Sequence, residues 1–174
     1  MLLPSTDTGL LTSHLEAHDG LISTVKMHLK EVENPFLHHL LSVKLKTMQS
    51  HVSVMLEMID PDKNDFSEVP PLEELSNSTS SEEKKQKAAT EMEIHLALQA
   101  KATTQSMAMD NFISALKMKN PEVKTAHVEM ALQQMQLLKE VTTFLKENEA
   151  EVTPFSNPDE QRKVLEHFRH MRSE

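Results

Sequence analysis

Three Asn-Pro pairs set the frame of this sequence: Asn34-Pro35, Asn120-Pro121 and Asn157-Pro158. Asn is among the preferred residues just before an α-helix, because its side-chain oxygen accepts a hydrogen bond from an N–H group of the first turn. Pro suits the first helical position, since its φ is already helical and it lacks only a donor that the helix cannot use. The three pairs therefore predict where three helices begin.

The residue types between these pairs also favour helix. The 174 residues include only 2 Gly, no Trp and no Tyr, whereas sheet proteins draw on Gly for turns and on aromatic residues for strands. Ala, Leu, Met, Glu, Lys and Gln, which are strong helix formers, are abundant instead. The sequence predicts an all-α protein, and its length is that of one ordinary domain covering residues 1–174.

Apolar residues in alternating steps of four and three predict the first two helices, over residues 7–32 and 35–59. The link around Asn34 is too short for anything but an antiparallel hairpin. The apolar stripe of the first helix comprises Leu11, Leu15, His18, Ile22, Val25, Leu29 and Val32, and that of the second comprises Leu41, Leu45, Met48, Val52, Met55 and Ile59.

A second hairpin is predicted from helices over residues 82–118 and 121–148. Ser80 and Glu83 have the spacing of a capping box, which marks a helix start. A short fifth helix over 158–170 would carry Val164, Leu165 and Phe168 on its apolar side. The predicted stripes are Ala88, Met92, His95, Gln99, Ala102, Ser106, Met109, Ile113 and Leu116 in the third helix, and Val128, Ala131, Met135, Leu138, Val141 and Leu145 in the fourth.

Residues 60–81 separate the two hairpins and are rich in Pro and small polar residues. A link of this length is uncommon in a compact domain unless it has a structural role. Two hairpins joined by a long crossover make a ferritin-like four-helix bundle. The alternative is an up-down-up-down bundle in which this link is only a long loop.

The net charge of −9 argues against binding to the phosphate backbone of nucleic acids. The chain has no Cys, which excludes thiolate metal sites and a cysteine nucleophile. No apolar run approaches the ~20 residues of a membrane span, and the first residues lack the basic start of a signal peptide. We therefore expect a protein made in the cytoplasm that contacts neither nucleic acid nor membrane.

A ferritin-like bundle raises the question of a carboxylate-bridged di-metal site. Such a site takes Glu from two helices and a Glu-x-x-His motif from each of the other two. None of the ten His has Glu three positions before it. The candidate carboxylates Glu16, Glu57, Glu93 and Glu129 all fall outside the predicted stripes. We therefore expect no catalytic residues and no cofactor of this class.

Several His could nevertheless meet inside the bundle. His18, His95 and Gln99 fall at a similar depth near the middle of their helices, where imidazole and amide groups could satisfy one another in a buried polar layer. The second interpretation is a metal site formed by His14, His18, His95 and His127. His14 and His18 are one turn apart, as metal-binding His pairs often are.

The stretch EVENPFLHHLLSVKLKTMQSHVSVMLEMI, residues 31–59, resembles the second helix of the spore coat protein F family and its ferritin-like relatives in endospore-forming bacteria. The preceding SHLEAHDGLISTVKMHLKEV is similar to their first helix. The resemblance implies a ferritin-like bundle and a structural role in the spore coat, without established catalysis. The absence of Tyr departs from many coat proteins, which are cross-linked through it.

These observations together predict a non-enzymatic protein that works by self-association or by docking other protein chains, including a second copy of itself. The apolar positions of the third helix outside its stripe, Ile94, Ala97, Leu98 and Ala108, would be the free surface for such a partner. The alternative function is that of a metal-binding ferritin-like protein with a His-based site.

Overall fold

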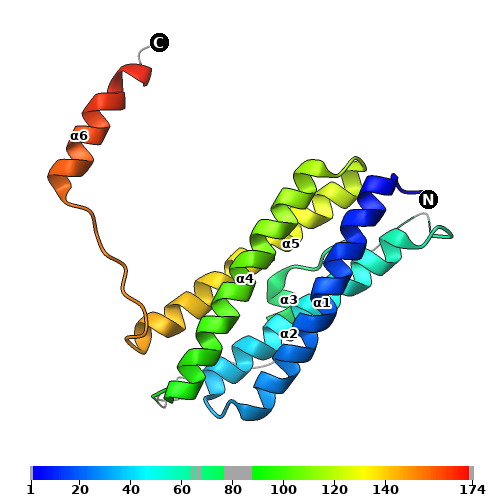
Figure 1. Cartoon of the computed structure of the whole chain (residues 1–174), viewed down its shortest axis with the longest axis horizontal. Coiled ribbons are helices and arrows are strands. Elements are labelled where there is room, and N and C mark those ends of the chain that lie inside the picture. Colours follow the sequence, from blue (N-terminus) through cyan, green and yellow to red (C-terminus); the bar gives the residue numbers. More distant parts are fainter. Residues whose placement is uncertain (1, 64, 66–67, 77–87, 173–174) are drawn as a thin grey trace.

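The computed structural model describes residues 2–63, 65, 68–76 and 88–172. Every regular element in these ranges is helical (Figure 1), which confirms the all-α class. The elements are α1 (Ser5–Glu31), α2 (Pro35–Ile59), α3 (Leu72–Ser76), α4 (Glu91–Lys117), α5 (Pro121–Glu147), α6 (Pro158–Phe168) and the 3₁₀ turn η1 (Arg169–Arg172).

The three Asn-Pro pairs begin helices as predicted. The side-chain oxygen of Asn34 accepts hydrogen bonds from the N–H groups of Phe36 and Leu37 at the start of α2. Asn120 and Asn157 cap α5 and α6 in the same way. These local interactions fix both hairpin turns, since only residues 32–34 separate α1 from α2 and only residues 118–120 separate α4 from α5.

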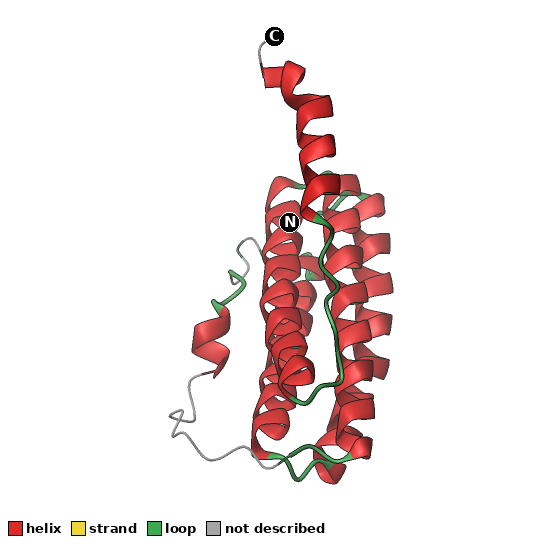
Figure 2. Ribbon diagram, turned by 90° about the vertical axis from the view of Figure 1, so that its left-hand side faces the viewer, coloured by secondary structure: helices red, strands yellow, loops and turns green. Residues whose placement is uncertain are grey.

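The four long helices pack side by side as a bundle (Figure 2). α1 lies beside α2 and α4, and α5 completes the bundle beside α2 and α4. Glu93 near the start of α4 contacts Asn34 at the turn between α1 and α2. Therefore α4 begins at the end of the bundle opposite to that where α2 ends, and the link between them travels the length of the bundle.

The described part of this link is held on the bundle by α3. Leu72 is buried together with Val43 of α2 and Leu137 of α5, and the amide nitrogen of Gln133 donates to the carbonyl of Pro70. The described part of the link thus contributes Leu72 to the core.

The predicted start of the third helix was wrong. α4 begins at Glu91, and its capping box is formed by Thr90 and Glu93, whose side chain and backbone groups pair in both directions. Residues 88–90 are not helical. The pair proposed for this role, Ser80 and Glu83, lies outside the described residues.

The predicted inward face of this helix was also wrong. Of its predicted stripe, Met92, Met109, Ile113 and Leu116 are exposed, and so are His95 and Gln99. α4 carries two stripes of suitable spacing, and the stripe that faces inward combines several small residues with Leu96 and Met107. The buried residues are Glu93, Leu96, Ala97, Ala100, Thr104, Met107, Ala108, Asn111, Ser114 and Ala115.

Predicted positions in α4 and α5 were wrong in two further cases. Ala97 and Ala108, expected on a free surface, belong to the interior. In α5 the predicted Met135 is exposed, whereas Ala131, Val141 and Leu145 are buried as expected. The spacing of apolar residues therefore gave the helices correctly but not always the face that packs.

Two buried carboxylates connect the hairpins reciprocally. The two oxygens of Asp7, in the first turn of α1, accept from the N–H groups of Lys119 (2.9 Å) and Asn120 (2.8 Å) in the α4–α5 turn. An oxygen of Glu93, in the first turn of α4, accepts from the N–H groups of Glu33 (3.0 Å) and Asn34 (2.6 Å) in the α1–α2 turn. Each hairpin thus holds the turn of the other.

The two clamps have the same spacing along the chain. Glu93 follows Asp7 by 86 positions, and Asn120 follows Asn34 by 86 positions. The expectation that no carboxylate faces the interior was wrong for Glu93, and Asp7 was not considered. Each accepts hydrogen bonds from two backbone N–H groups of the opposite turn, in keeping with the pairing of backbone polar groups in protein interiors.

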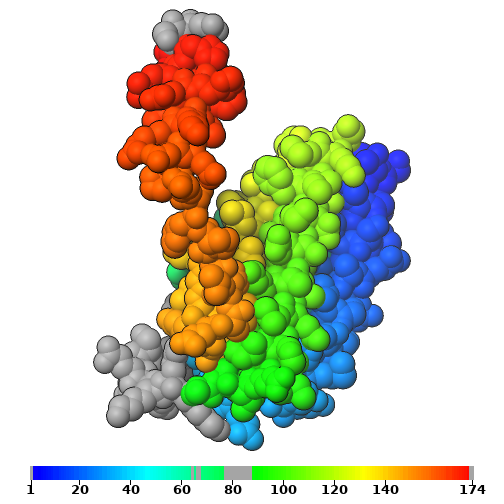
Figure 3. Space-filling model, turned by 60° about the vertical axis from the view of Figure 1, so that its left-hand side comes forward, coloured from blue at the N-terminus to red at the C-terminus, as the bar shows by residue number. Residues whose placement is uncertain are grey.

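The C-terminal segment is packed differently from the bundle. Residues 148–157 connect α5 to α6 (Figure 3). An ion pair of 2.6 Å between Lys101 and Glu151 holds the start of this connection against α4. No residue of α6 or η1 is buried, and in Figure 2 this segment extends beyond the end of the bundle. Its start at Pro158 was predicted correctly.

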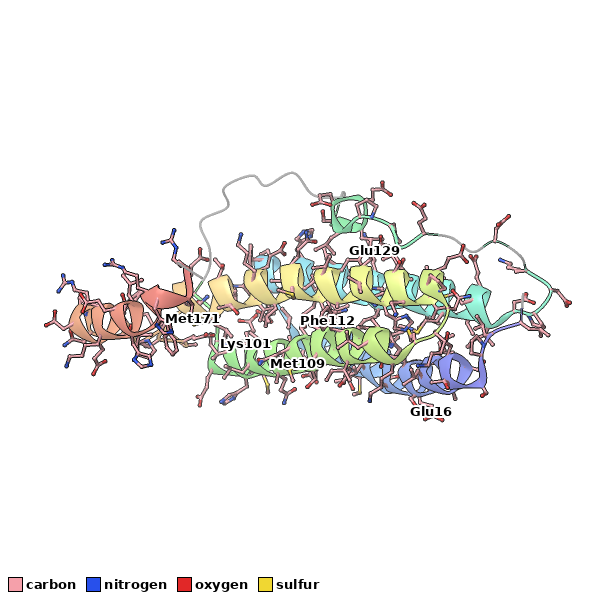
Figure 4. The ribbon with its side chains drawn as sticks, turned by 90° about the horizontal axis from the view of Figure 1, so that it is seen from above. Glu16, Lys101, Met109, Phe112, Glu129 and Met171 are labelled. Atoms are coloured by element: carbon pink, nitrogen blue, oxygen red, sulfur yellow. The ribbon has the colours of Figure 1, made fainter. Side chains whose placement is uncertain are left out.

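Replacing either clamping carboxylate should destabilise the fold. Asp7→Ala or Glu93→Ala leaves two turn N–H groups without acceptors, and we expect a loss of about 1–3 kcal/mol in the free energy of unfolding, measured with urea. Glu16 of α1 and Glu129 of α5 are exposed (Figure 4) and serve as controls. Equal losses in Glu16→Ala or Glu129→Ala would contradict the clamp.

Glu93 should also make the fold sensitive to acid. Burial alone raises its pKa, but hydrogen bonds from Thr90, Asn34 and Glu33 outweigh this and place the pKa below the ordinary value of 4.5. The stabilisation is therefore complete above pH 4.5 and is lost as the pH falls through the folded pKa. Below pH 4.5, stability should fall more steeply in the wild type than in Glu93→Gln, and parallel curves would argue against this.

Candidate functional site: a buried histidine cluster

Four buried His side chains from three helices meet inside the bundle. They are His14 and His18 of α1, His51 of α2 and His127 of α5. The ring centroids of His14 and His127 are 5.0 Å apart, and those of His18 and His51 are 5.7 Å apart, both in edge-to-face arrangements. The cluster is the main group of buried titratable side chains in the described residues.

The sequence located part of this cluster. His14, His18 and His127 were candidates and are brought together, but His95 and Gln99 are exposed on the outer side of α4, so the predicted layer of His18, His95 and Gln99 was wrong. His51 was missed because Val52 was assigned to the α2 stripe. The signal was present, since His51 is three residues after Met48 and four before Met55.

Hydrogen bonds to carbonyl groups assign the protons of two imidazole rings. Nδ1 of His18 lies 2.7 Å from the carbonyl oxygen of His14, and Nδ1 of His127 lies 2.9 Å from that of Val123. A carbonyl oxygen only accepts, so in both rings Nδ1 carries the hydrogen. The neutral rings of His18 and His127 therefore present Nε2 as an unprotonated acceptor.

Gln133 assigns the third ring. Its amide nitrogen donates to the carbonyl of Pro70, so its oxygen is the atom that faces Nε2 of His51, at 2.6 Å. Nε2 of His51 must then donate, which leaves Nδ1 of His51 as the acceptor in the neutral ring. This nitrogen lies 3.5 Å from Nε2 of His18.

Burial keeps the cluster uncharged near neutral pH. The pKa of His51 is lowered to about 3 and that of His14 to about 4, mainly by loss of water contact and in smaller part by the neighbouring imidazoles. The pKa values of His18 and His127 are lowered for the same main reason. All four rings are therefore neutral at pH 7.

Among the described residues, the buried polar side chains of the interior are only partly satisfied. His14 Nε2 lies 2.9 Å from the hydroxyl of Ser114, and Asn111 donates to the carbonyl of Met107. His127 Nε2, Asn111 Oδ1 and both polar side-chain atoms of Gln134 are buried without a hydrogen-bond partner. Such unsatisfied groups are uncommon and call for an explanation.

The arrangement is not a complete metal site as it stands. Among the described residues, no group of three or more His, Cys, Asp or Glu side chains is placed to hold a metal ion. The negative charge of Asp7 partly opposes the lowering of the His127 pKa. The carboxylate oxygens of Asp7, however, already accept hydrogen bonds from the α4–α5 turn.

A buried lysine links α2 to α4 elsewhere in the interior. The ammonium nitrogen of Lys44 donates to the carbonyl of Ala100 (3.0 Å) and to the hydroxyls of Thr103 (2.6 Å) and Thr104 (2.8 Å). Three acceptors match the three N–H groups of an ammonium ion. Burial opposes the charge, however, and lowers the pKa of Lys44 to about 7.

Comparison with protein-family models, with curated proteins and with solved structures gave no match. Within the described residues, no helix is long and apolar enough to cross a membrane. The described residues therefore form an all-helical bundle whose apolar interior also holds a cluster of buried histidines.

Lys44 should make stability depend on pH in the alkaline range. Between about pH 7 and pH 10.5 the unfolded chain holds a proton on this amine that the folded chain does not, so the free energy of unfolding should rise with pH. Lys44→Met should remove that rise, whereas Lys124→Met, at an exposed position, should keep it. Identical slopes in wild type and Lys44→Met would contradict the assignment.

Proposed function

We propose that this protein is a non-enzymatic, ferritin-like bundle that works by self-association. Two antiparallel hairpins joined by a link that travels the length of the bundle support the ferritin-like description. The resemblance of residues 31–59 to the spore coat protein F family supports a structural role, with synthesis in the cytoplasm and assembly in the spore coat.

The observation that carries this proposal is an apolar face of α4 that no described residue covers. Met109, Phe112, Ile113 and Leu116 follow the i, i+3, i+4, i+7 spacing of a helix-docking face, and between 44% and 70% of each side chain is exposed. Figure 4 shows Met109 and Phe112 on α4 at the surface of the bundle. Contiguous exposed apolar residues of this kind mark interaction sites.

The same chain supplies a matching helix. Val164, Leu165, Phe168 and Met171 form one side of α6 and η1, and more than half of each side chain is exposed. Val164 to Met171 covers eight residues, as does Met109 to Leu116, so the two faces have similar lengths. The exposed amphipathic helix and the exposed face of α4 can cover each other.

Charge favours the same pairing. Residues 158–172 carry four basic and three acidic side chains, so the rest of this chain, whose total is −9, has a net charge of −10. From Arg162 onward the segment has four basic residues and only Glu166 as an acid. Asp110 and Lys117 are both exposed beside the α4 face, so the attraction is between the segment and the acidic bundle as a whole.

The occupant that fits best is α6 of a second copy. In Figures 1 and 2 the segment stands clear of its own bundle, and α6 points past the bundle end. Two copies that exchange α6 form two equivalent contacts about a two-fold axis, which closes a dimer.

The self-association proposal predicts a dimer that depends on both faces. In light scattering of the untagged full chain, Phe168→Glu and Ile113→Glu should each give monomers, because a carboxylate in an apolar contact is strongly unfavourable. Leu56→Glu places the same charge on an exposed position of α2 and should leave the dimer intact. A monomeric wild type at high concentration would contradict the proposal.

Cysteine cross-linking can locate the contact because the chain has no Cys of its own. A mixture of Ile113→Cys and Phe168→Cys proteins should form a disulfide-linked heterodimer under mild oxidation, and a mixture of Leu56→Cys and Phe168→Cys should not. An intrachain disulfide in the Ile113→Cys, Phe168→Cys double variant, formed while the protein is monomeric, would show that α6 folds back on its own bundle and would overturn the exchange.

The alternative function, metal binding by His14, His18, His95 and His127, cannot use His95, which is exposed on α4. The other three lie with His51, which makes a site of different composition conceivable.

A further inference from the structure

The contact between His18 and His51 brings two unprotonated nitrogens together. Nε2 of His18 and Nδ1 of His51 are 3.5 Å apart, and each is an acceptor because the other nitrogen of its ring donates to an oxygen. Two unprotonated nitrogens this close together in a buried site repel each other. A cation between them would turn this contact into an attraction.

The separation distinguishes a metal ion from a shared proton. Hydrogen bonds from N–H groups are usually about 2.9–3.0 Å long, so 3.5 Å is long for a proton bridge. Nitrogen ligands about 2.0–2.1 Å from a tetrahedral zinc ion lie about 3.4 Å apart. The observed separation therefore corresponds to one edge of a tetrahedral site.

A third nitrogen is available close by. Nε2 of His127 is unprotonated, buried and without a hydrogen-bond partner, and its ring contacts that of His14. His14 Nε2 is engaged only by a serine hydroxyl. Since the described residues contain no group of three placed to hold an ion, the His127 or His14 ring must turn to complete the site.

The outer hydrogen bonds are those that metal-binding imidazoles usually have. Such a ring commonly donates its second N–H to a carbonyl or carboxylate, which fixes the ring and its tautomer. His18, His51 and His127 donate to the oxygens of His14, Gln133 and Val123, respectively. The rings of His18 and His51 are thus already oriented by groups that would remain in place with an ion bound.

We propose that His18, His51 and His127, with His14 as the fourth ligand, form a buried binding site for one divalent transition metal ion of the zinc class. Imidazole ligands favour Zn²⁺, Co²⁺, Ni²⁺ and Cu²⁺, whereas Mg²⁺ and Ca²⁺ require oxygen ligands. The site goes beyond the self-association proposal and does not depend on it, because the α4 and α6 faces use other residues.

Cobalt titration of the untagged full chain tests the site directly. At pH 7.5 we expect one Co²⁺ per chain, with the intense visible absorption of tetrahedral coordination, and displacement by an equal amount of Zn²⁺. His51→Gln and His18→Ala should each lose this absorption. His38→Ala and His95→Ala, both at exposed positions, should retain it.

Circular dichroism and thermal melting of each variant separate loss of the site from loss of the fold. His51→Gln is the more informative change because Gln is polar and can still pair with Gln133. A folded wild type that binds no Co²⁺ or Zn²⁺ would overturn the proposal. So would Co²⁺ binding that survives in folded His51→Gln but disappears in His95→Ala.

Discussion

The reciprocal clamp of Asp7 and Glu93 is the interaction on which the rest of the bundle depends. Each carboxylate begins one hairpin and accepts the backbone N–H groups in the turn of the other. One set of contacts lies at each end of the bundle. Together they fix the antiparallel packing of α1 against α4 and the axial positions of the helices. The positions of His18, His51 and Lys44 inside the bundle follow from that alignment.

The interior holds polar side chains, but its titratable groups are mostly neutral. Burial lowers the pKa of Lys44 to about 7 and those of His14 and His51 to about 4 and 3. Acceptors from neighbouring helices satisfy Lys44, whereas the His18–His51 contact leaves two unprotonated nitrogens close together. The first arrangement stabilises packing, and the second is the reason to expect an ion.

The sequence predicted what local interactions determine. Asn34, Asn120 and Asn157 begin helices because each caps the turn that follows it, and the short links require hairpins. The face of α4 could not be predicted from spacing, since one stripe contains Leu96, Ala100 and Met107 and the other contains Met109, Ile113 and Leu116. The inward position of Glu93 and the joining of His51 to the cluster depend on partners far along the chain.

The α4 stripe that misled the prediction is the feature that best supports self-association, because exposed apolar residues of helix-docking spacing mark interaction surfaces. Hydrogen exchange of α6 at two protein concentrations tests this most directly. We predict that the amides of residues 160–170 exchange slowly at a concentration where the protein is dimeric and rapidly after dilution to monomer. Equal and rapid exchange at both concentrations would show that α6 has no partner and would contradict the account.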